Sequence, residues 1–131
     1  MNSTQQSAKS TKINTYRDLI VWQKTDSFAH LVYKETKLFP KSEIFGLTSQ
    51  LRRAALSVPT NIVEGYSRLS KNEFRHFLTI SYGSLSEAEY LLLFSLEEGL
   101  IKKEDYENLI SLKDECGRLI WGMYISQKKS A

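Results

Sequence analysis

The sequence contains few of the residues that cross-link, interrupt or anchor a fold. A single cysteine, Cys116, excludes an intramolecular disulfide and is typical of a reducing compartment. Two prolines and six glycines leave most of the 131 residues free to form long helices. No apolar run reaches the ~20 residues that a membrane span needs, and residues 1–18 lack the apolar segment of a secretory signal. We therefore expect one cytoplasmic, helix-rich domain without a membrane partner.

Charge of one sign is also scarce, because the formal net charge is only +3. Residues 1–17 and 40–70 are basic, whereas residues 71–99 carry an excess of acidic side chains. A dedicated nucleic-acid-binding domain usually has a stronger basic excess. Composition alone therefore gives weak support for a nucleic-acid partner.

Motifs for catalysis and cofactor binding are missing as well. The sequence has no phosphate-binding loop, dinucleotide-binding glycine motif or nucleophile elbow. Glu73 and His76 form one Glu-x-x-His, but a di-iron bundle needs two copies and two further glutamates. Cys116 is expected in the core of the last helix, and Glu87 and Glu89 diverge on a helix. We predict no enzyme, no metal and no cofactor.

What the sequence does contain is apolar residues at helical spacing. They predict helices over about 16–37, 45–66, 71–98 and 103–127, forming a domain over 16–127. Residues 1–15 are expected to be a disordered polar tail and residues 128–131 a flexible one. Ser70 and Glu73 predict a capping box, and Gly99 a helix end. Long helices with short connections are typical of an all-α, antiparallel up-and-down four-helix bundle.

Pro59 falls inside the second predicted helix. The apolar stripe continues through it at helical spacing, over Leu47, Leu51, Ala54, Ala55, Val58 and Ile62. An interior proline removes one backbone hydrogen bond and bends the helix. We predict a kink at Pro59. The alternative is a true break, with a new helix beginning at the proline.

Two helices have more apolar residues than one core face needs. Beyond the predicted core of the third helix (Phe74, Phe77, Leu78, Ser81, Leu85, Ala88 and Leu92), the side chains of Ile80, Leu91, Leu93 and Phe94 point elsewhere. Leu56 and Val63, one heptad apart, do the same on the second helix. An additional apolar face marks an interface, so we predict a homo-oligomer through Leu56, Val63, Ile80, Leu91 and Phe94. The alternative is a wider core covered by the N-terminal tail.

Charged residues refine this picture. Glu87 lies on the outer side of the third helix, either paired with an arginine across the interface or solvated at its rim. Arg52 flanks Leu56 and Val63 and is the candidate for an interfacial salt bridge. Arg53 points nearly opposite the core, and with Arg68, Lys71 and Arg75 it is a candidate for phosphate contacts. A solvated charged face is the alternative.

Several separated segments resemble one known family. They are DLIVWQKT (18–25), LFPKSEIFGLTSQLRRAALSVPTNIVEGYSR (38–68), EFRHFLTISYGSLSEAEYLL (73–92) and EEGLI (97–101). Their order and spacing resemble the four-helix-bundle proteins encoded in intervening sequences of bacterial 23S rRNA genes, which are related to the accessory variability proteins of diversity-generating retroelements. The resemblance implies an antiparallel bundle that assembles as a homopentamer.

For the retroelement relatives the resemblance further implies a basic surface that binds nucleic acid and a partner reverse transcriptase. The expectation is therefore a non-enzymatic, oligomeric accessory protein that binds RNA or DNA. The alternative is a structural or protein-partner scaffold whose arginines serve subunit pairing. Charge reversal distinguishes the two. If Arg53 contacts phosphate, its reversal weakens a binding that also falls steeply with salt. If the arginines pair subunits, Arg52→Glu dissociates the oligomer.

Overall fold

The computed structural model describes residues 12–129, and its ordered elements are all helices. Four long helices carry the fold: α2 (Ile20–Thr36), α3 (Leu47–Tyr66), α4 (Lys71–Glu97) and α5 (Lys103–Lys129). Short 3-10 helices, η1 (Tyr16–Asp18) and η2 (Lys41–Glu43), precede α2 and α3. Within residues 12–129 there is no strand. The all-α prediction with four helices is confirmed.

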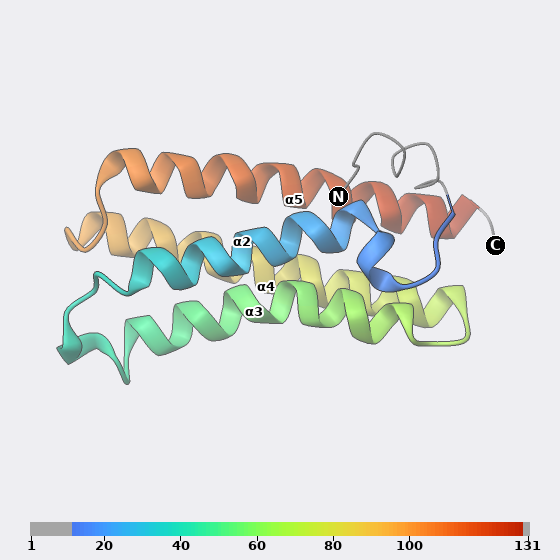
Figure 1. The fold of residues 1–131 in the computed structure, drawn as a ribbon, viewed down its shortest axis with the longest axis horizontal. Coiled ribbons are helices and arrows are strands. Elements are labelled where there is room, and N and C mark those ends of the chain that lie inside the picture. The colour runs from blue at the N-terminus through green and yellow to red at the C-terminus, as the bar shows by residue number, and fades with distance from the viewer. Residues whose placement is uncertain (1–11, 130–131) are drawn as a thin grey trace, which may run out of the picture.

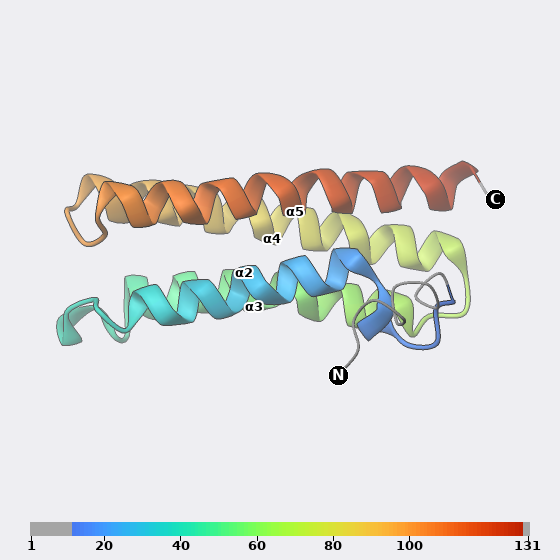
Figure 2. The ribbon, with the colours of Figure 1, turned by 45° about the horizontal axis from the view of Figure 1, so that its top comes forward.

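Each long helix contacts two others, which gives the bundle four sides. The pairs in contact are α2 with α3, α3 with α4, α4 with α5, and α5 with α2. The chain reverses direction at each connection, and both ends of the described chain lie at the end where α3 turns into α4 (Figures 1 and 2). The α2–α3 side and the α4–α5 side are therefore opposite faces of the molecule.

The first helix begins later than predicted, because the chain is interrupted at Leu19. Thr15 and Asp18 form a complete capping box around η1, in which the Thr15 side chain accepts a hydrogen bond from the Arg17 amide. Leu19 then has extended dihedral angles, with φ −79° and ψ 124°. A continuous helix over 16–37 is therefore wrong, and α2 runs from Ile20 to Thr36.

The other helix ends agree with the sequence to within two residues. Gly46, at φ −115° and ψ −111°, delays α3 to Leu47. The Ser70 hydroxyl accepts a hydrogen bond from the Glu73 amide at 3.1 Å, which confirms the serine half of the predicted cap. Gly99 adopts φ 76°, and the Leu100 amide donates to the Ser95 carbonyl at 2.9 Å. This Schellman ending is the one that the glycine predicted. The polar tails predicted at 1–15 and 128–131 fall partly outside the described residues.

Helix α3 continues through Pro59, so a break at the proline is wrong, and the bend itself stays a prediction. Three carbonyls just before the proline accept side-chain hydrogen bonds. Thr60 donates to the Leu56 carbonyl, Asn61 to the Ser57 carbonyl, and Ser81 of α4 to the Val58 carbonyl, at 2.7, 2.8 and 2.8 Å. These bonds stabilise the part of the helix where an interior proline weakens the backbone ladder.

The core follows the predicted stripes closely. All six predicted positions of α3 are buried, as are six of the seven predicted on α4, with Phe77 half-buried. Cys116 is also buried, on α5. Close packing of α3 on α4 depends on Gly65, because a Cβ atom there would lie 2.8 Å from Phe74 and Phe77.

Candidate nucleic-acid and subunit interfaces

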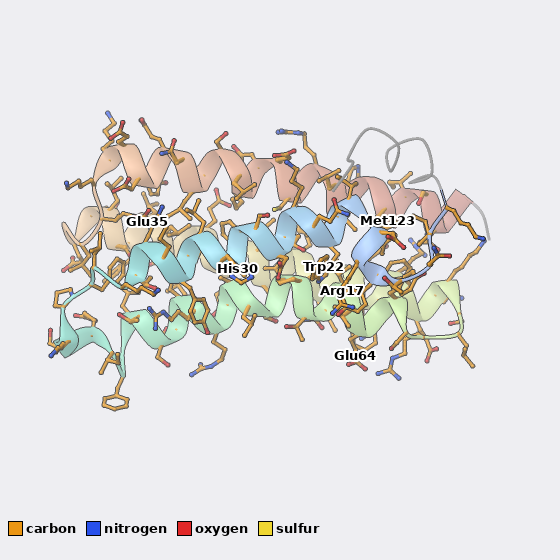
Figure 3. All side chains as sticks on the ribbon, in the orientation of Figure 1. Arg17, Trp22, His30, Glu35, Glu64 and Met123 are labelled. Carbon is orange, nitrogen blue, oxygen red and sulfur yellow. The ribbon has the colours of Figure 1, made fainter. Side chains whose placement is uncertain are left out.

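The two ends of the bundle differ in charge. The basic end comprises residues 12–18, 64–75 and 124–128, and carries six basic side chains against three acidic ones: Lys12, Arg17, Arg68, Lys71, Arg75 and Lys128 against Asp18, Glu64 and Glu73. The acidic end comprises residues 34–47 and 97–107, with five basic side chains against seven acidic ones. Figure 3 shows Arg17 and Glu64 toward the basic end and Glu35 toward the other. Local charge reaches +3 at one end and −2 at the other.

A surface hollow opens at the basic end. It has a volume of about 440 Å³ and lies where the N-terminal segment, the α3–α4 turn and the last turns of α5 meet. Arg68 and Lys71 line it together with apolar and aromatic side chains (Ile13, Leu19, Tyr66, Leu69, Phe74 and Met123). Leu69, one of these lining residues, is fully exposed. A hollow with two cationic side chains on an apolar floor suits an anionic ligand with flat apolar parts.

The three predicted phosphate contacts at this end differ in their surroundings. Arg68 forms an ion pair with Glu64 at 2.7 Å and lies 4.8 Å above the Phe77 ring. Arg75 lies 4.2 Å above the Tyr124 ring, and its buried Nε has no hydrogen-bond partner within the described chain. Lys71 is exposed at the rim of the hollow. Arg68 and Lys71 are therefore the best placed to contact a phosphate.

Arg53 does not belong to this cluster. It lies 13 residues before Tyr66, the last residue of α3, which is about 20 Å at 1.5 Å per residue, and Arg68 follows in the turn after that helix end. Its guanidinium is exposed and makes one long hydrogen bond, to Ser49 at 3.4 Å. The structure brings together Arg68, Lys71 and Arg75, and leaves Arg53 apart.

Arg52 is occupied within its own chain. Its Nε donates to the Thr36 hydroxyl at 2.8 Å, and a terminal nitrogen donates to the Tyr33 carbonyl at 3.3 Å. The guanidinium also lies 4.7 Å above the Tyr33 ring. Arg52 therefore holds α3 against the C-terminal turn of α2, where helix carbonyls lack intrahelical partners.

Leu56 lies on the α2–α3 side, as two hollows there share it. One, of about 380 Å³, is lined by Asp26, Ala29, His30, Tyr33, Lys34, Lys37 and Leu56. The other, of about 400 Å³, is lined by Tyr33, Ile44, Thr48, Ser49, Arg52, Arg53 and Leu56. Leu56 is 47% exposed, and Val63, one heptad later, is half-buried. Lys34 and Lys37 were not predicted from the sequence, because their place in a hollow with Leu56 depends on which helices pack together.

The α4 residues predicted for the interface do not share one environment. Ile80 and Phe94 are 38% and 40% exposed, and Glu87 is exposed between them. Leu91 is only 9% exposed and belongs to the core, so its predicted outward position is wrong. The reason is the close approach of α3, to which Ser81 and Ser84 of α4 are hydrogen-bonded at 2.8 and 2.9 Å. The flank of α4 nearest α3 is therefore buried.

The α4–α5 side carries an aromatic surface that was not predicted from the sequence. An apolar hollow of about 280 Å³ is lined by Leu78, Thr79, Tyr82, Ile120, Trp121 and Tyr124. A second, of about 310 Å³, shares Tyr82 and Trp121 with it and adds Glu89, Lys113, Asp114 and Arg118. Tyr82 and Trp121 are 48% and 58% exposed. The spacing of Trp121 and Tyr124 on one helix face was the available signal.

Lys113 is drawn into the α4–α5 side by two carboxylates. Its ammonium lies 2.8 Å from Asp114 and 3.1 Å from Glu89, with the lysine side chain 14% exposed and the carboxylates about half exposed. Burial disfavours the charged lysine, but the hydrogen bonds that Lys113 donates to Asp114 and Glu89 outweigh it and raise the pKa of Lys113. Of these three side chains, the acidic Glu89 and Asp114 are therefore the ones that face solvent.

Side chains that could bind a metal ion or act in catalysis do not cluster within the described residues. No cluster of three or more histidine, cysteine, aspartate and glutamate side chains suited to a metal ion occurs over 12–129. His76 packs edge-on against Phe77, with ring centroids 5.6 Å apart. Burial raises the pKa of the Cys116 thiol to about 12, which keeps it protonated at neutral pH. None of the described helices combines the length and hydropathy that crossing a bilayer requires.

The fold and its sequence have known relatives. No curated protein matches the chain. A crystal structure of a protein of unknown function from the S23 ribosomal protein family of Bacteroides thetaiotaomicron is 25% identical, with a TM-score of 0.72, covering 80% of this chain and 98% of that one. Residues 17–122 match the family described as 23S rRNA-intervening sequence protein. This match covers α2, α3, α4 and most of α5, so the chain belongs to the 23S rRNA-intervening sequence protein family.

Proposed function

We propose that this protein is a non-enzymatic, homo-oligomeric accessory protein that binds RNA through its basic end. The observation that carries the proposal is the separation of charge along the bundle, +3 at one end and −2 at the other, with a hollow lined by Arg68 and Lys71 at the positive end. The rRNA association in the family's description favours RNA over DNA as the ligand.

Arg68, Lys71 and Arg75 make the phosphate contacts in this proposal, with Arg53 as a more distant contact along α3. Basic side chains that neutralise phosphates release counterions, so affinity falls as salt rises. Such contacts need local density of charge and no base-reading code. The aromatic floor of the hollow, with Tyr66 and Phe74, offers surface to an unstacked base.

The test is RNA binding of a double charge reversal, Arg68→Glu with Lys71→Glu, measured by fluorescence anisotropy on 23S rRNA fragments over a range of salt. We expect wild-type binding that weakens linearly with log salt, and a loss of about 10-fold or more for the variant. The matched control is Lys102→Glu with Lys103→Glu at the acidic end, which leaves binding unchanged. Equal losses for both variants, or no wild-type binding at low salt, would contradict the proposal.

A scaffold without a nucleic-acid ligand is the second candidate. The internal contacts of Arg68 with Glu64 and of Arg75 with Tyr124 favour it, because they give these arginines a structural use. In this case Arg52→Glu lowers the oligomer mass, while the Arg68 and Lys71 variant leaves every partner bound. A reverse transcriptase is the expected protein partner if the relationship to retroelement accessory proteins holds.

The remaining features of the proposal concern assembly and compartment. An antiparallel up-and-down bundle, bent at Pro59, forms a homopentamer in the cytoplasm. Two surfaces are candidates for subunit contacts: the α2–α3 side with Leu56 and Val63, and the outward face of α4 with Ile80, Glu87 and Phe94. Leu56, Ile80 and Phe94 leave 38–47% of their surfaces exposed in a single chain, which supports an apolar contact between copies.

A further inference from the structure

We infer that an unpaired RNA base binds on the α4–α5 side, which makes single-stranded RNA the preferred ligand. The inference rests on the RNA binding in the proposed function, and it names the class of RNA and a second place of contact. The place is the aromatic hollow, the apolar hollow of about 280 Å³ lined by Tyr82, Trp121 and Tyr124. Trp121 is more than half exposed there, and an exposed indole in a concave apolar surface is suited to cover a flat ring.

The rings of the aromatic hollow are already arranged as bases are in a stack. Trp121 and Tyr124 lie with their ring centroids 5.7 Å apart and an angle of 20° between their planes. Tyr82 of α4 lines the same hollow and is about half exposed. Base–aromatic stacking tolerates every base, because each base has a π-face. The exposed surface of Trp121 and Tyr82 therefore offers a place for one further flat ring.

Arginines lie on both sides of this stack along α5. Arg118, one turn before Trp121, is exposed and lines the adjoining hollow with it. On the other side the Arg75 guanidinium lies 4.2 Å above the Tyr124 ring. Neither arginine takes part in an ion pair within residues 12–129. Burying unpaired arginines against a protein surface is costly, whereas the phosphates on either side of a stacked base supply the opposite charge.

The acidic pair beyond Arg118 limits the site on one side. Glu89 and Asp114 line the adjoining hollow, where Lys113 and Arg118 balance their charge. Asp114 lies seven residues before Trp121 on α5, which is about 10 Å at 1.5 Å per residue. A phosphate placed beyond Arg118 would meet these two carboxylates. The RNA strand is therefore expected to run from Arg118 toward the basic end of the bundle.

The aromatic hollow adjoins the hollow at the basic end. Phe74 of α4 and Met123 of α5 line the basic-end hollow. The next residue on each helix, Arg75 and Tyr124, belongs to the stack just described. One RNA strand can therefore reach both hollows, with Arg75 at the boundary between them.

Double-stranded RNA cannot use the aromatic hollow in this way. Its bases are stacked on one another, and proteins contact mainly its phosphates and 2′-hydroxyls. Unpaired bases, in contrast, stack on aromatic side chains. The basic end alone would bind both forms of RNA through their phosphates, so a difference between the two forms reports the contact with Trp121.

The experiment compares a single-stranded RNA of about 12 nucleotides with the duplex of the same sequence by fluorescence anisotropy. We expect Trp121→Ala to weaken binding of the single strand about 5- to 100-fold, as for the loss of one base–aromatic stack, and to leave duplex binding unchanged. Trp121→Phe, which keeps an aromatic ring, restores most of the affinity. Tyr90→Ala is the matched control and changes neither affinity, because Tyr90 is 62% exposed on α4 but lines neither hollow of the α4–α5 side.

Tryptophan fluorescence reports the stack directly. Trp22 and Trp121 are the two tryptophans of the chain, so Trp22→Phe leaves Trp121 as the only one. In this variant we expect the single strand to quench the tryptophan emission and the duplex to leave it unchanged. Quenching by both RNAs, or by neither, would overturn the inference.

Two further outcomes separate this inference from the proposed function. If Trp121→Ala binds the single strand as tightly as the wild type, while the Arg68 and Lys71 variant loses both RNAs, the inference fails and the proposed function stands. If the wild type binds neither RNA at low salt, both fail. A lower mass of Trp121→Ala in light scattering, together with its loss of RNA affinity, would assign Trp121 to a contact between copies and overturn the inference.

Discussion

The basic and acidic ends of the bundle hold similar numbers of cations but use them differently. Six basic side chains lie at one end and five at the other, so the contrast comes from the acidic residues, three against seven. Near the acidic end Arg52 is committed to the fold through Thr36 and Tyr33, whereas Lys71 lines an open hollow at the basic end. The number of acidic side chains, more than the number of cations, therefore separates the two ends in charge.

The largest expected effect is on the packing of the basic end. Gly65→Val places side-chain atoms against Phe74 and Phe77, where even a Cβ would be 2.8 Å away. Forcing volume into a packed helix contact costs roughly 1–3 kcal/mol, and we expect the upper part of this range. Urea unfolding followed by circular dichroism measures it. Gly83→Ala is the control: nothing lies within 4 Å of its Cβ, so we expect a gain of about 0.5–1 kcal/mol.

The next effect separates the folding role of Arg52 from a binding role. Arg52→Ala removes the donor to the Thr36 hydroxyl and one of the two side-chain donors to the Tyr33 carbonyl, which keeps only the Thr36 hydroxyl. We expect a loss of about 1.5–3 kcal/mol in the free energy of unfolding and unchanged RNA affinity at temperatures where the variant is folded. Unchanged stability of Arg52→Ala together with weakened RNA binding would instead assign RNA binding to the surface around Arg52, near the acidic end.

Arg68 should behave in the opposite way. Its ion pair with Glu64 joins side chains that are 39% and 49% exposed, and such pairs contribute at most about 1 kcal/mol. We expect Arg68→Ala to leave stability nearly unchanged. The slope of log affinity against log salt should fall by about 1 in magnitude, as for one lost phosphate contact. A large loss of stability with an unchanged slope would assign Arg68 to the fold.

The smallest effect is the pH dependence of the N-terminal turn. The Asn14 and Thr15 amides donate to Asp18 and lower its pKa below 3.8. Because the folded pKa is depressed, the contribution of Asp18 is present above the unfolded pKa and is lost as pH falls through the folded pKa. Amide chemical shifts of Asn14 and Thr15 should follow this titration, and Asp18→Asn should abolish it. Identical titrations in both proteins would exclude the capping contact.

The fold could be predicted from the sequence where apolar residues recur at helical spacing along one helix face without interruption. The α3 stripe was correct at every position because its 3.6-residue period survives Pro59. Leu91 was wrong because its burial depends on how closely α3 approaches α4, which Gly65 and the paired serines decide. The break at Leu19 was missed because the Thr15 and Asp18 cap, three residues apart, lies inside an apparently continuous helical pattern.

The candidate sites were less predictable, since they depend on which helices become neighbours. Arg68 and Lys71 line one hollow, and Arg75 lies one helical turn after Lys71, because the three residues are close in sequence around one turn; their role as phosphate contacts stays a prediction. Arg53 was grouped with them by residue type, but it lines a different hollow, which α3 forms with Tyr33 of α2 and Ile44, from a distant part of the chain. The aromatic α4–α5 side combines Tyr82 with Trp121, which lie 39 positions apart and meet only through packing.

The hydrogen bonds beside Pro59 have a consequence for how the helices can slide. Leucine and isoleucine contacts tolerate small axial slips, because apolar packing is not directional. The Ser81–Val58 and Ser57–Ser84 bonds do not, since a slip of one residue, about 1.5 Å, would break both. Four small polar or proline-adjacent positions therefore fix the vertical alignment of α3 against α4. Substituting Ser57, Ser81 and Ser84 with alanine would keep the apolar core and remove both directional hydrogen bonds described between these two helices.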